Sequence, residues 1–105
     1  MKRPWIMTDP VITYTETDTK GRYVARVAGT SAEGELTLSK ASPQTVIVDH
    51  TGVPDALRGQ GIAAALARRA IADARERGQK IVPLCPFFRA YAERHRDDLA
   101  DVIQW

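Results

Sequence analysis

The first half of the chain alternates short runs of β-branched and aromatic residues with turns that contain glycine, proline or aspartate. Such runs predict β-strands. In the second run, three apolar residues alternate with Arg22, Val24 and Arg26, so only one face of that strand is clearly polar. The predicted strands cover residues 11–15, 22–27, 32–39 and 45–53. The predicted turns between them cover residues 18–21, 28–31 and 41–44.

The fourth run differs from the others because Val46, Ile47 and Val48 are continuously apolar. A strand with one solvent-facing side would alternate instead, so this run predicts a central strand that is covered on both faces. In the third run, Leu36 and Leu38 share one face of their strand. The four strands therefore predict a sheet with its apolar face turned toward a core.

The pattern changes to helical spacing in the second half of the chain. Apolar residues recur every three or four positions from 56 to 77, and Gly78 is a suitable residue to end that helix. A short apolar strand follows at residues 80–84, and further helices are predicted at 86–94 and 97–103. The order strand, helix, strand predicts a parallel pair joined by a right-handed crossover. The expected fold class is α/β, with antiparallel N-terminal strands in a mixed sheet.

Composition sets limits on the class of protein. The chain has 105 residues and a formal net charge of +2, and we expect an N-terminal arm at residues 1–10 and a single domain at 11–105. The basic residues alternate with acidic ones, which argues against a nucleic-acid partner. Cys85 is the single cysteine, so an internal disulfide framework is excluded. No run is apolar enough to span a membrane or to form a secretory signal, and we expect a cytoplasmic protein.

The join between the fourth strand and the long helix carries the first candidate chemistry. Gly59 and Gly61 stand where the helix is expected to begin, and Arg58 adds a positive charge. A helix N-terminus presents unpaired N–H groups and the positive end of the helix dipole, and glycines let an anion approach the backbone closely. No Gly-Lys-Ser/Thr follows, so the loop is not a P-loop. The spacing also differs from the dinucleotide fingerprint.

Arg58-Gly59-Gln60-Gly61-Ile62-Ala63 resembles the Arg/Gln-x-x-Gly-x-Gly/Ala acetyl-coenzyme-A signature of the GCN5-related N-acetyltransferases. More narrowly, His50-Thr51-Gly52-Val53-Pro54, Pro83-Leu84-Cys85-Pro86-Phe87 and Tyr91 resemble the small, single-domain branch of that family. The resemblance covers about residues 11–103. It implies a compact fold in which the fourth and fifth strands splay apart around the cofactor.

The resemblance also implies roles for individual residues. Backbone N–H groups from Gly59 to Ala63 would bind the pyrophosphate, and the backbone at Thr51, Gly52 and Val53 would bind the pantetheine arm. An amine would then attack the thioester directly, and Tyr91 matches the family's proton donor to the departing thiolate. The sequence departs from the family pattern in two ways. His95 replaces the usual glycine, and the chain lacks the last two family strands, which often line the acceptor site.

Each candidate catalytic residue also has a simpler interpretation. Cys85 precedes Pro86 at a helix start, where it could carry the acetyl group, contact the cofactor sulfur, or be a small buried residue. Tyr91 could donate a proton or pack in the core beside Phe87 and Phe88. His50 could deprotonate the amine or serve as a structural histidine on a buried strand. No spacing of His, Cys, Asp and Glu suits a metal, so none is expected.

Three functions follow from this sequence. The first is transfer of acetyl from acetyl-coenzyme A to an amine, on either a small molecule or a protein lysine. The alternative is a coenzyme-A-binding regulatory module with little or no turnover, which the missing acceptor wall would explain. A basic nucleic-acid-binding domain is the third and weakest interpretation.

Overall fold

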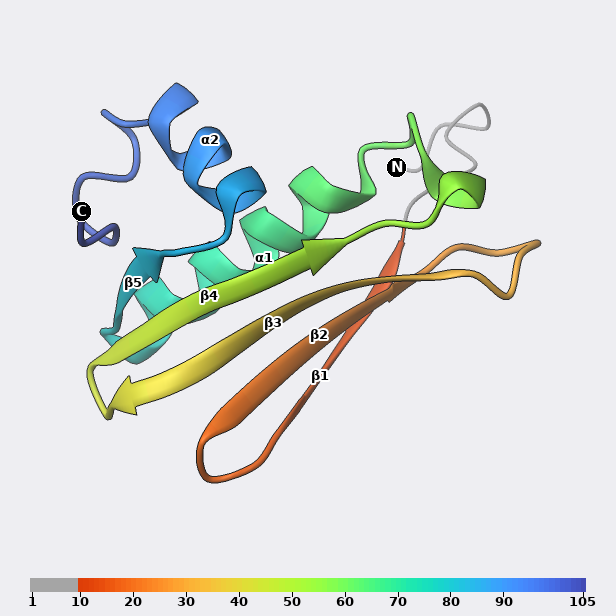
Figure 1. Cartoon of the computed structure of the whole chain (residues 1–105). Coiled ribbons are helices and arrows are strands. Elements are labelled where there is room, and N and C mark those ends of the chain that lie inside the picture. Colours follow the sequence, from red (N-terminus) through yellow and green to blue (C-terminus); the bar gives the residue numbers. More distant parts are fainter. Residues whose placement is uncertain (1–9) are drawn as a thin grey trace.

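The computed structural model describes residues 10–105, so the arm predicted at residues 1–10 lies, apart from Pro10, outside the described residues. Five strands form one sheet in the order β1-β2-β3-β4-β5 (Figure 1). Their bounds are β1 Val11–Glu16, β2 Lys20–Arg26, β3 Glu33–Ser42, β4 Thr45–Gly52 and β5 Lys80–Pro83. The first four strands pair antiparallel, and β5 pairs parallel to β4. The predicted mixed sheet is confirmed.

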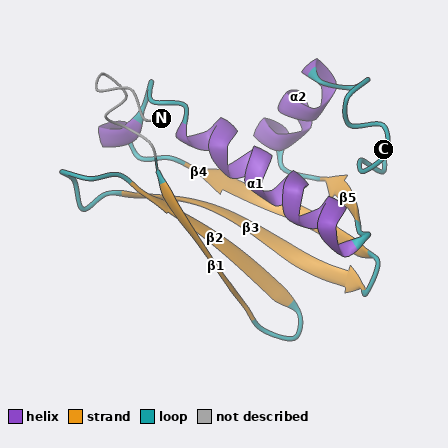
Figure 2. Ribbon diagram, turned by 180° about the vertical axis from the view of Figure 1, so that it is seen from behind, coloured by secondary structure: helices purple, strands orange, loops and turns teal. Residues whose placement is uncertain are grey.

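Two helices cover one face of this sheet, as the opposite views in Figures 1 and 2 show. Strand β4 is central, as predicted, but the expectation that it is covered on both faces is wrong, because no helix of residues 10–105 lies on its other face. Helix α1 (Ile62–Arg77) connects β4 to β5, and α2 (Pro86–Arg94) follows β5. The apolar stripe predicted for α1 is buried, and it packs with the apolar positions of β2, β3 and β4 and with Phe88 of α2 in one core. No helix among residues 10–105 is long and apolar enough to cross a membrane.

The long helix begins later than the sequence predicts. The expected start was residue 56, whereas the structure has a short 3-10 turn, η1 (Asp55–Leu57), then a loop, and α1 starts at Ile62. Gly59 and Gly61 both adopt left-handed backbone angles, which interrupt a right-handed helix. The 16 residues of α1 give a helix about 24 Å long.

Two turns also differ from the prediction. The β1–β2 hairpin turns at residues 18 and 19, and Gly21 is a strand residue, not a turn residue. A Cβ at Gly21 would lie 2.5 Å from the Tyr14 hydroxyl, so glycine here leaves room for that side chain. Strand β3 likewise continues to Ser42, which confines the next turn to Pro43 and Gln44.

The helix expected at residues 97–103 is absent, and the segment forms turns that join the sheet. Ile103 makes a parallel bridge to Ile81. The Ile81 N–H donates to the Val102 carbonyl at 2.8 Å, and the Gln104 N–H donates to the Ile81 carbonyl at 2.8 Å. Val102 and Ile103 are buried in the core. The apolar spacing that suggested a helix therefore serves a segment that lies along the outer edge of β5.

A tyrosine pair fixes β1 and β2 against α1. The rings of Tyr14 and Tyr23 lie 4.5 Å apart, and the Tyr23 hydroxyl donates a 2.7 Å hydrogen bond to Asp73 of α1. Burial, reinforced by that hydrogen bond, raises the pKa of Tyr23 well above its usual value. Burial and a hydrogen bond to Glu16 raise the pKa of Tyr14 to about 12.

These shifts predict a loss of stability at alkaline pH. A phenol with a raised native pKa contributes stability that is complete below its unfolded pKa of about 10 and is lost as the pH rises above that value. In Tyr23→Phe, we expect the free energy of unfolding at pH 7 to fall by about 1.5–3 kcal/mol, because a hydrogen bond to a charged group is lost. Its alkaline decline should also be shallower. Urea unfolding from pH 7 to 11 measures both, and equal slopes for the two proteins would contradict the assignment.

Candidate functional site

The candidate site lies where β5 separates from β4. The two strands pair only from Thr45 to Val48 on β4, and β5 ends at Pro83. The register of β4 against β3 shifts at the same place, because Leu38 pairs with Val48 and Thr37 pairs with His50. Asp49 is therefore the extra residue of a bulge, which bends its strand. The edge of β4 after Val48 has no neighbouring strand within residues 10–105, and it includes the backbone that the family resemblance implies would bind pantetheine.

Beyond the edge of β4, the loop before α1 presents backbone N–H groups. Gly61 caps the helix with φ at 72°, no side chain caps the first turn, and no acidic residue lies in that turn. Ala65 is the first residue whose N–H bonds back along the helix, to the Gly61 carbonyl at 3.0 Å. A Cβ at Gly59 or Gly61 would meet nothing within 4 Å, so the space beside both glycines is open. The loop, with Ile62 and Ala63 at the start of α1, therefore fits a pyrophosphate bound through main-chain N–H groups.

The two polar side chains of this loop are held by nearby residues. The Arg58 side chain is 76% exposed, and its Nε lies 2.9 Å from an Asp55 carboxylate oxygen. An exposed ion pair of this kind contributes little to stability, so a phosphate can take the place of Asp55 at low cost. Gln60 donates a 3.4 Å hydrogen bond to the Ala56 carbonyl, and its own amide oxygen is buried without a partner among the described residues.

Gly34 on β3 lies against the start of α1, and the sequence analysis did not identify this residue. A Cβ at Gly34 would lie 2.9 Å from the Ile62 Cγ2 atom and 3.6 Å from the Gly52 carbonyl oxygen. The absence of a side chain therefore lets the first residue of α1 sit close to the sheet. An isolated glycine inside a strand pattern is the signal that could have identified this contact.

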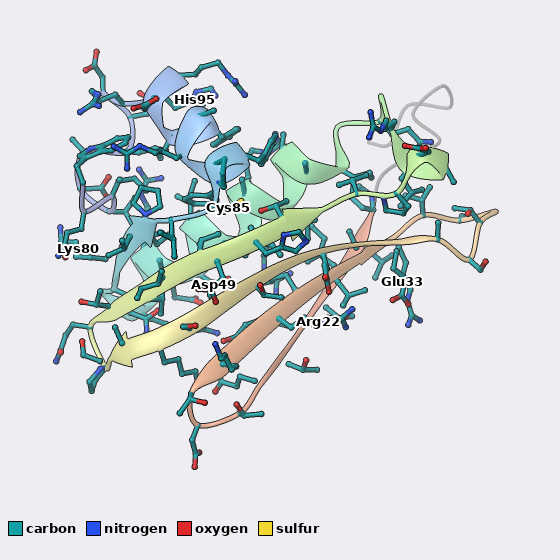
Figure 3. The ribbon with its side chains drawn as sticks, viewed as in Figure 1. Arg22, Glu33, Asp49, Lys80, Cys85 and His95 are labelled. Atoms are coloured by element: carbon teal, nitrogen blue, oxygen red, sulfur yellow. The ribbon has the colours of Figure 1, made fainter. Side chains whose placement is uncertain are left out.

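Cys85 lies on the other side of the gap that opens between β4 and β5 after Val48. It is 3% exposed, and its N–H donates to the Val48 carbonyl at 2.9 Å, the last backbone hydrogen bond between β4 and the segment after β5. Its Sγ lies 3.6 Å from the Thr51 Oγ1, so the thiol and a candidate pantetheine-binding residue of β4 face each other. Cys85 is also the N-cap of α2, with Pro86 at the first helical position. Figure 3 shows it at the join of β5 and α2, beside β4.

Tyr91 belongs to the same face of the sheet as Cys85. It is 8% exposed within the core cluster, and its hydroxyl forms no hydrogen bond with residues 10–105. The ring of His95, which caps the C-terminal end of α2, lies 4.4 Å from the Tyr91 ring. The Tyr91 ring therefore packs in the core, while its hydroxyl has no hydrogen-bond partner within residues 10–105. Both interpretations of Tyr91 fit this geometry.

His50 lies on the opposite face from these two residues. Directly paired residues of antiparallel strands share a face, and His50 pairs with Thr37 whereas Thr51 pairs with the fully buried Leu36. The His50 side chain is exposed, so its interpretation as a structural histidine on a buried strand is wrong. The structure does not bring it together with Cys85 and Tyr91.

No group of three or more His, Cys, Asp and Glu side chains in the described part of the chain is arranged to hold a metal ion. Among known proteins, the sequence profile of the GCN5-related N-acetyl-transferase family matches residues 22–102. A comparison with curated proteins gave no match.

The chain is similar to a solved structure from Staphylococcus aureus, the solution structure of a GCN5-like protein proposed to be an N-acetyltransferase. The two share 28% sequence identity with a TM-score of 0.65, over 88% of this chain and 87% of the other.

Proposed function

Because the chain belongs to the family of GCN5-related N-acetyltransferases, we propose that it transfers the acetyl group of acetyl-coenzyme A to an amine. The proposal assigns this activity to residues 11–105 as one domain. Its main support is the left-handed glycine loop at the start of α1, which stands beside the unpaired edge of β4. An anion-binding helix start and an open strand edge together suit a ligand with a pyrophosphate at one end and an amide-bearing arm at the other.

The residues of the loop and of β4 bind and orient the donor. The N–H groups from Gly59 to Ala63 hold the pyrophosphate, and Arg58 exchanges its ion pair with Asp55 for a phosphate. The backbone from Thr51 to Val53 pairs with the amides of the pantetheine arm, as an added strand would. The thioester then lies in the gap that Cys85 and Thr51 face. Since these bonds use the main chain, side-chain changes at Thr51 or Val53 would leave most of them in place.

The groups around the gap assist the transfer. The amine nitrogen forms a bond to the thioester carbon and gives up one proton to solvent water, the carbon–sulfur bond breaks, and the sulfur takes a proton as coenzyme A leaves. The positive end of α2 at Cys85 favours the negative charge that develops on that sulfur. The proposal assigns the proton to Tyr91, whose hydroxyl is not engaged elsewhere in residues 10–105. Cys85 contacts the reacting group from the β5 side.

The loop assignment predicts a loss of coenzyme A binding in Gly61→Leu. A side chain at this residue fills the open space that the phosphates would occupy, and we expect the dissociation constant to rise at least about tenfold, the effect of about 1.4 kcal/mol. Gly78→Leu is a matched control, because φ is 72° at Gly61 and 68° at Gly78, at the far end of α1.

Both Gly61→Leu and Gly78→Leu should lose roughly 1–2 kcal/mol of stability through the left-handed strain. Only the first should lose affinity in isothermal titration with coenzyme A. Equal affinities in the two folded variants would remove the loop from the proposed site.

Cys85→Ala tests the thiol. We expect turnover to fall at least about tenfold while coenzyme A binding is kept, because the removed group faces the reacting atoms and not the pyrophosphate. Cys85→Ser keeps a hydroxyl that can bond to Thr51 and separates the loss of the thiol from the loss of that contact. Full activity in Cys85→Ala would show that the Cys85 side chain only packs in the core.

Tyr91→Phe tests the proton donor. General acid catalysis typically contributes about 10²–10⁴-fold, so we expect kcat to fall within that range while coenzyme A affinity and the free energy of unfolding stay nearly unchanged. Release of free coenzyme A with a panel of amines gives the rate. A change in stability alone would assign Tyr91 to the core. Tight coenzyme A binding by the wild-type protein without turnover would favour the regulatory module.

A further inference from the structure

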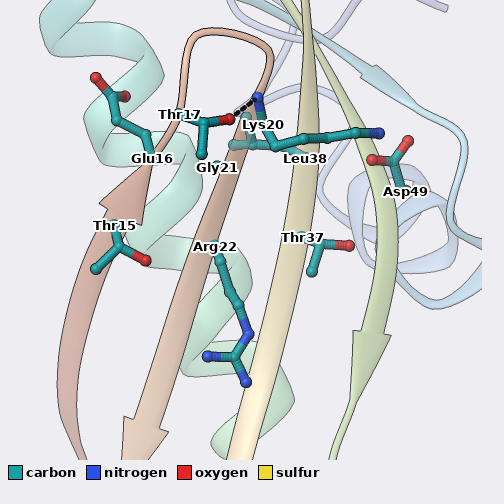
Figure 4. Close-up of a pocket in the computed structure, with 9 residues that line it drawn as sticks. All are labelled: Thr15, Glu16, Thr17, Lys20, Gly21, Arg22, Thr37, Leu38 and Asp49. Atoms are coloured by element: carbon teal, nitrogen blue, oxygen red, sulfur yellow. Dashed lines mark hydrogen bonds between the residues drawn. The ribbon is translucent and has the colours of Figure 1, made fainter.

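The face of the sheet opposite α1 and α2 carries a groove that the proposed donor site leaves unused. Neither helix covers this face (Figures 1 and 2). A cavity of about 510 Å³ lies over β1 to β4, lined by residues that include Thr15, Lys20, Arg22, Thr37 and Asp49 (Figure 4). That volume is within the range of about 300–1,000 Å³ typical of small-molecule sites.

One end of this groove lies at the residue of β4 after which β4 and β5 separate. Asp49, the bulge residue, lines the groove and directly follows Val48, whose carbonyl accepts the Cys85 N–H. Thr51, two residues further on, faces Cys85 on the helix side of the sheet. A carboxylate on the open face and a thiol on the helix face therefore lie on either side of β4, next to the point where β5 leaves it (Figure 3).

The carboxylate of Asp49 retains capacity to bind a cation. Its Oδ2 accepts a 2.8 Å hydrogen bond from the Ser39 hydroxyl, which in turn accepts one of 2.8 Å from the Lys20 ammonium. Within residues 10–105 its other oxygen accepts no hydrogen bond. An ionised carboxylate has about four acceptor positions, so an incoming ammonium can bind beside the Ser39 hydroxyl.

Two positive groups lie in the groove, Lys20 beside Asp49 and Arg22 two residues further along β2. The Arg22 Nε donates a 2.8 Å hydrogen bond to Glu35, which leaves the two terminal amino groups of the guanidinium to bind an anion. The Lys20 side chain extends across β3 toward Asp49 (Figure 4). A ligand with a second positive charge would meet Lys20 and Arg22 unfavourably, whereas a carboxylate would be attracted to them.

We propose that this groove binds the acceptor and that the acceptor is a small amine carrying a carboxylate, of the amino-acid type. Its ammonium is held by Asp49, and its carboxylate is held by Arg22. Before it attacks the thioester, the ammonium gives up one proton to solvent water. The inference rests on the proposed acetyl transfer, because only then does an amine at the gap meet a thioester on the other side. The donor enters from the helix face and the acceptor from the open face.

Matched small amines test this class. The probes are ω-amino acids of two to six carbons, the diamines of the same chain lengths, and the corresponding alkylamines. Coenzyme A release from acetyl-coenzyme A should give the highest kcat/KM with an amino acid, a lower value with the alkylamine and the lowest with the diamine. A diamine that matches or exceeds the amino acid of its length would overturn the assignment.

Arg22→Gln and Arg26→Gln form a matched pair of variants. Both arginines lie on the open face of β2, and each pairs with a glutamate of β3, Glu35 for Arg22 and Glu33 for Arg26, but only Arg22 lines the groove. Arg22→Gln should raise KM for the amino acid about tenfold, the effect of losing one charged contact, and should remove the discrimination against diamines. Arg26→Gln should change neither. Equal effects in both variants would assign Arg22 to sheet stability alone.

Two binding measurements separate this inference from the proposed function. Titration of the isotope-labelled protein with an ω-amino acid should shift the backbone amide signals of Arg22, Thr37 and Asp49 whether or not turnover occurs. Absence of those shifts with every probe would overturn the groove assignment. Isothermal titration with coenzyme A should give the same affinity for the wild type and Arg22→Gln. A wild-type protein that fails to bind coenzyme A would instead refute the proposed acetyl transfer.

Discussion

The hydrogen bond from the Cys85 N–H to the Val48 carbonyl is the constraint on which the rest of the site depends. It is the last backbone hydrogen bond between β4 and the segment that follows β5. Up to this bond the parallel pair is continuous, and beyond it the bulge at Asp49 turns β4 away. The separation leaves the edge of β4 after Val48 without a neighbouring strand within residues 10–105. A normal extension of β5 would have covered that edge.

The sequence predicted the parts of the fold that rest on hydrophobic period. The alternation in β2 and β3 and the stripe of α1 were interpreted correctly, because both show which residues face the core. The apolar run at residues 46–48 was misread as a strand covered on both faces, since no helix of residues 10–105 covers the open face and Ile47 is only partly buried there. The tail from 97 to 103 was misread because its apolar spacing fits a helix, although hydrogen bonds to Ile81 hold it as turns beside the sheet. Backbone pairing with β5 therefore outweighed the helical spacing of the apolar residues in this segment.

The candidate site was predictable only where a motif marks the backbone. Gly59 and Gly61 were identified because left-handed angles and close approach restrict a position to glycine. The face on which His50 lies could not be read from the sequence, since the bulge at Asp49 changes the alternation along β4. The contact of Gly34 with Ile62 joins residues far apart in the chain, and no local pattern encodes it.

The bridge between Ile103 and Ile81 has a consequence for how the molecule is made. During synthesis, β4, α1 and β5 emerge from the ribosome well before residues 99–104. Until that segment docks, β5 lacks its outer hydrogen bonds and the core lacks Leu99, Val102 and Ile103. A chain that has folded only as far as β5 therefore carries an open strand edge, which is a template for pairing with another chain.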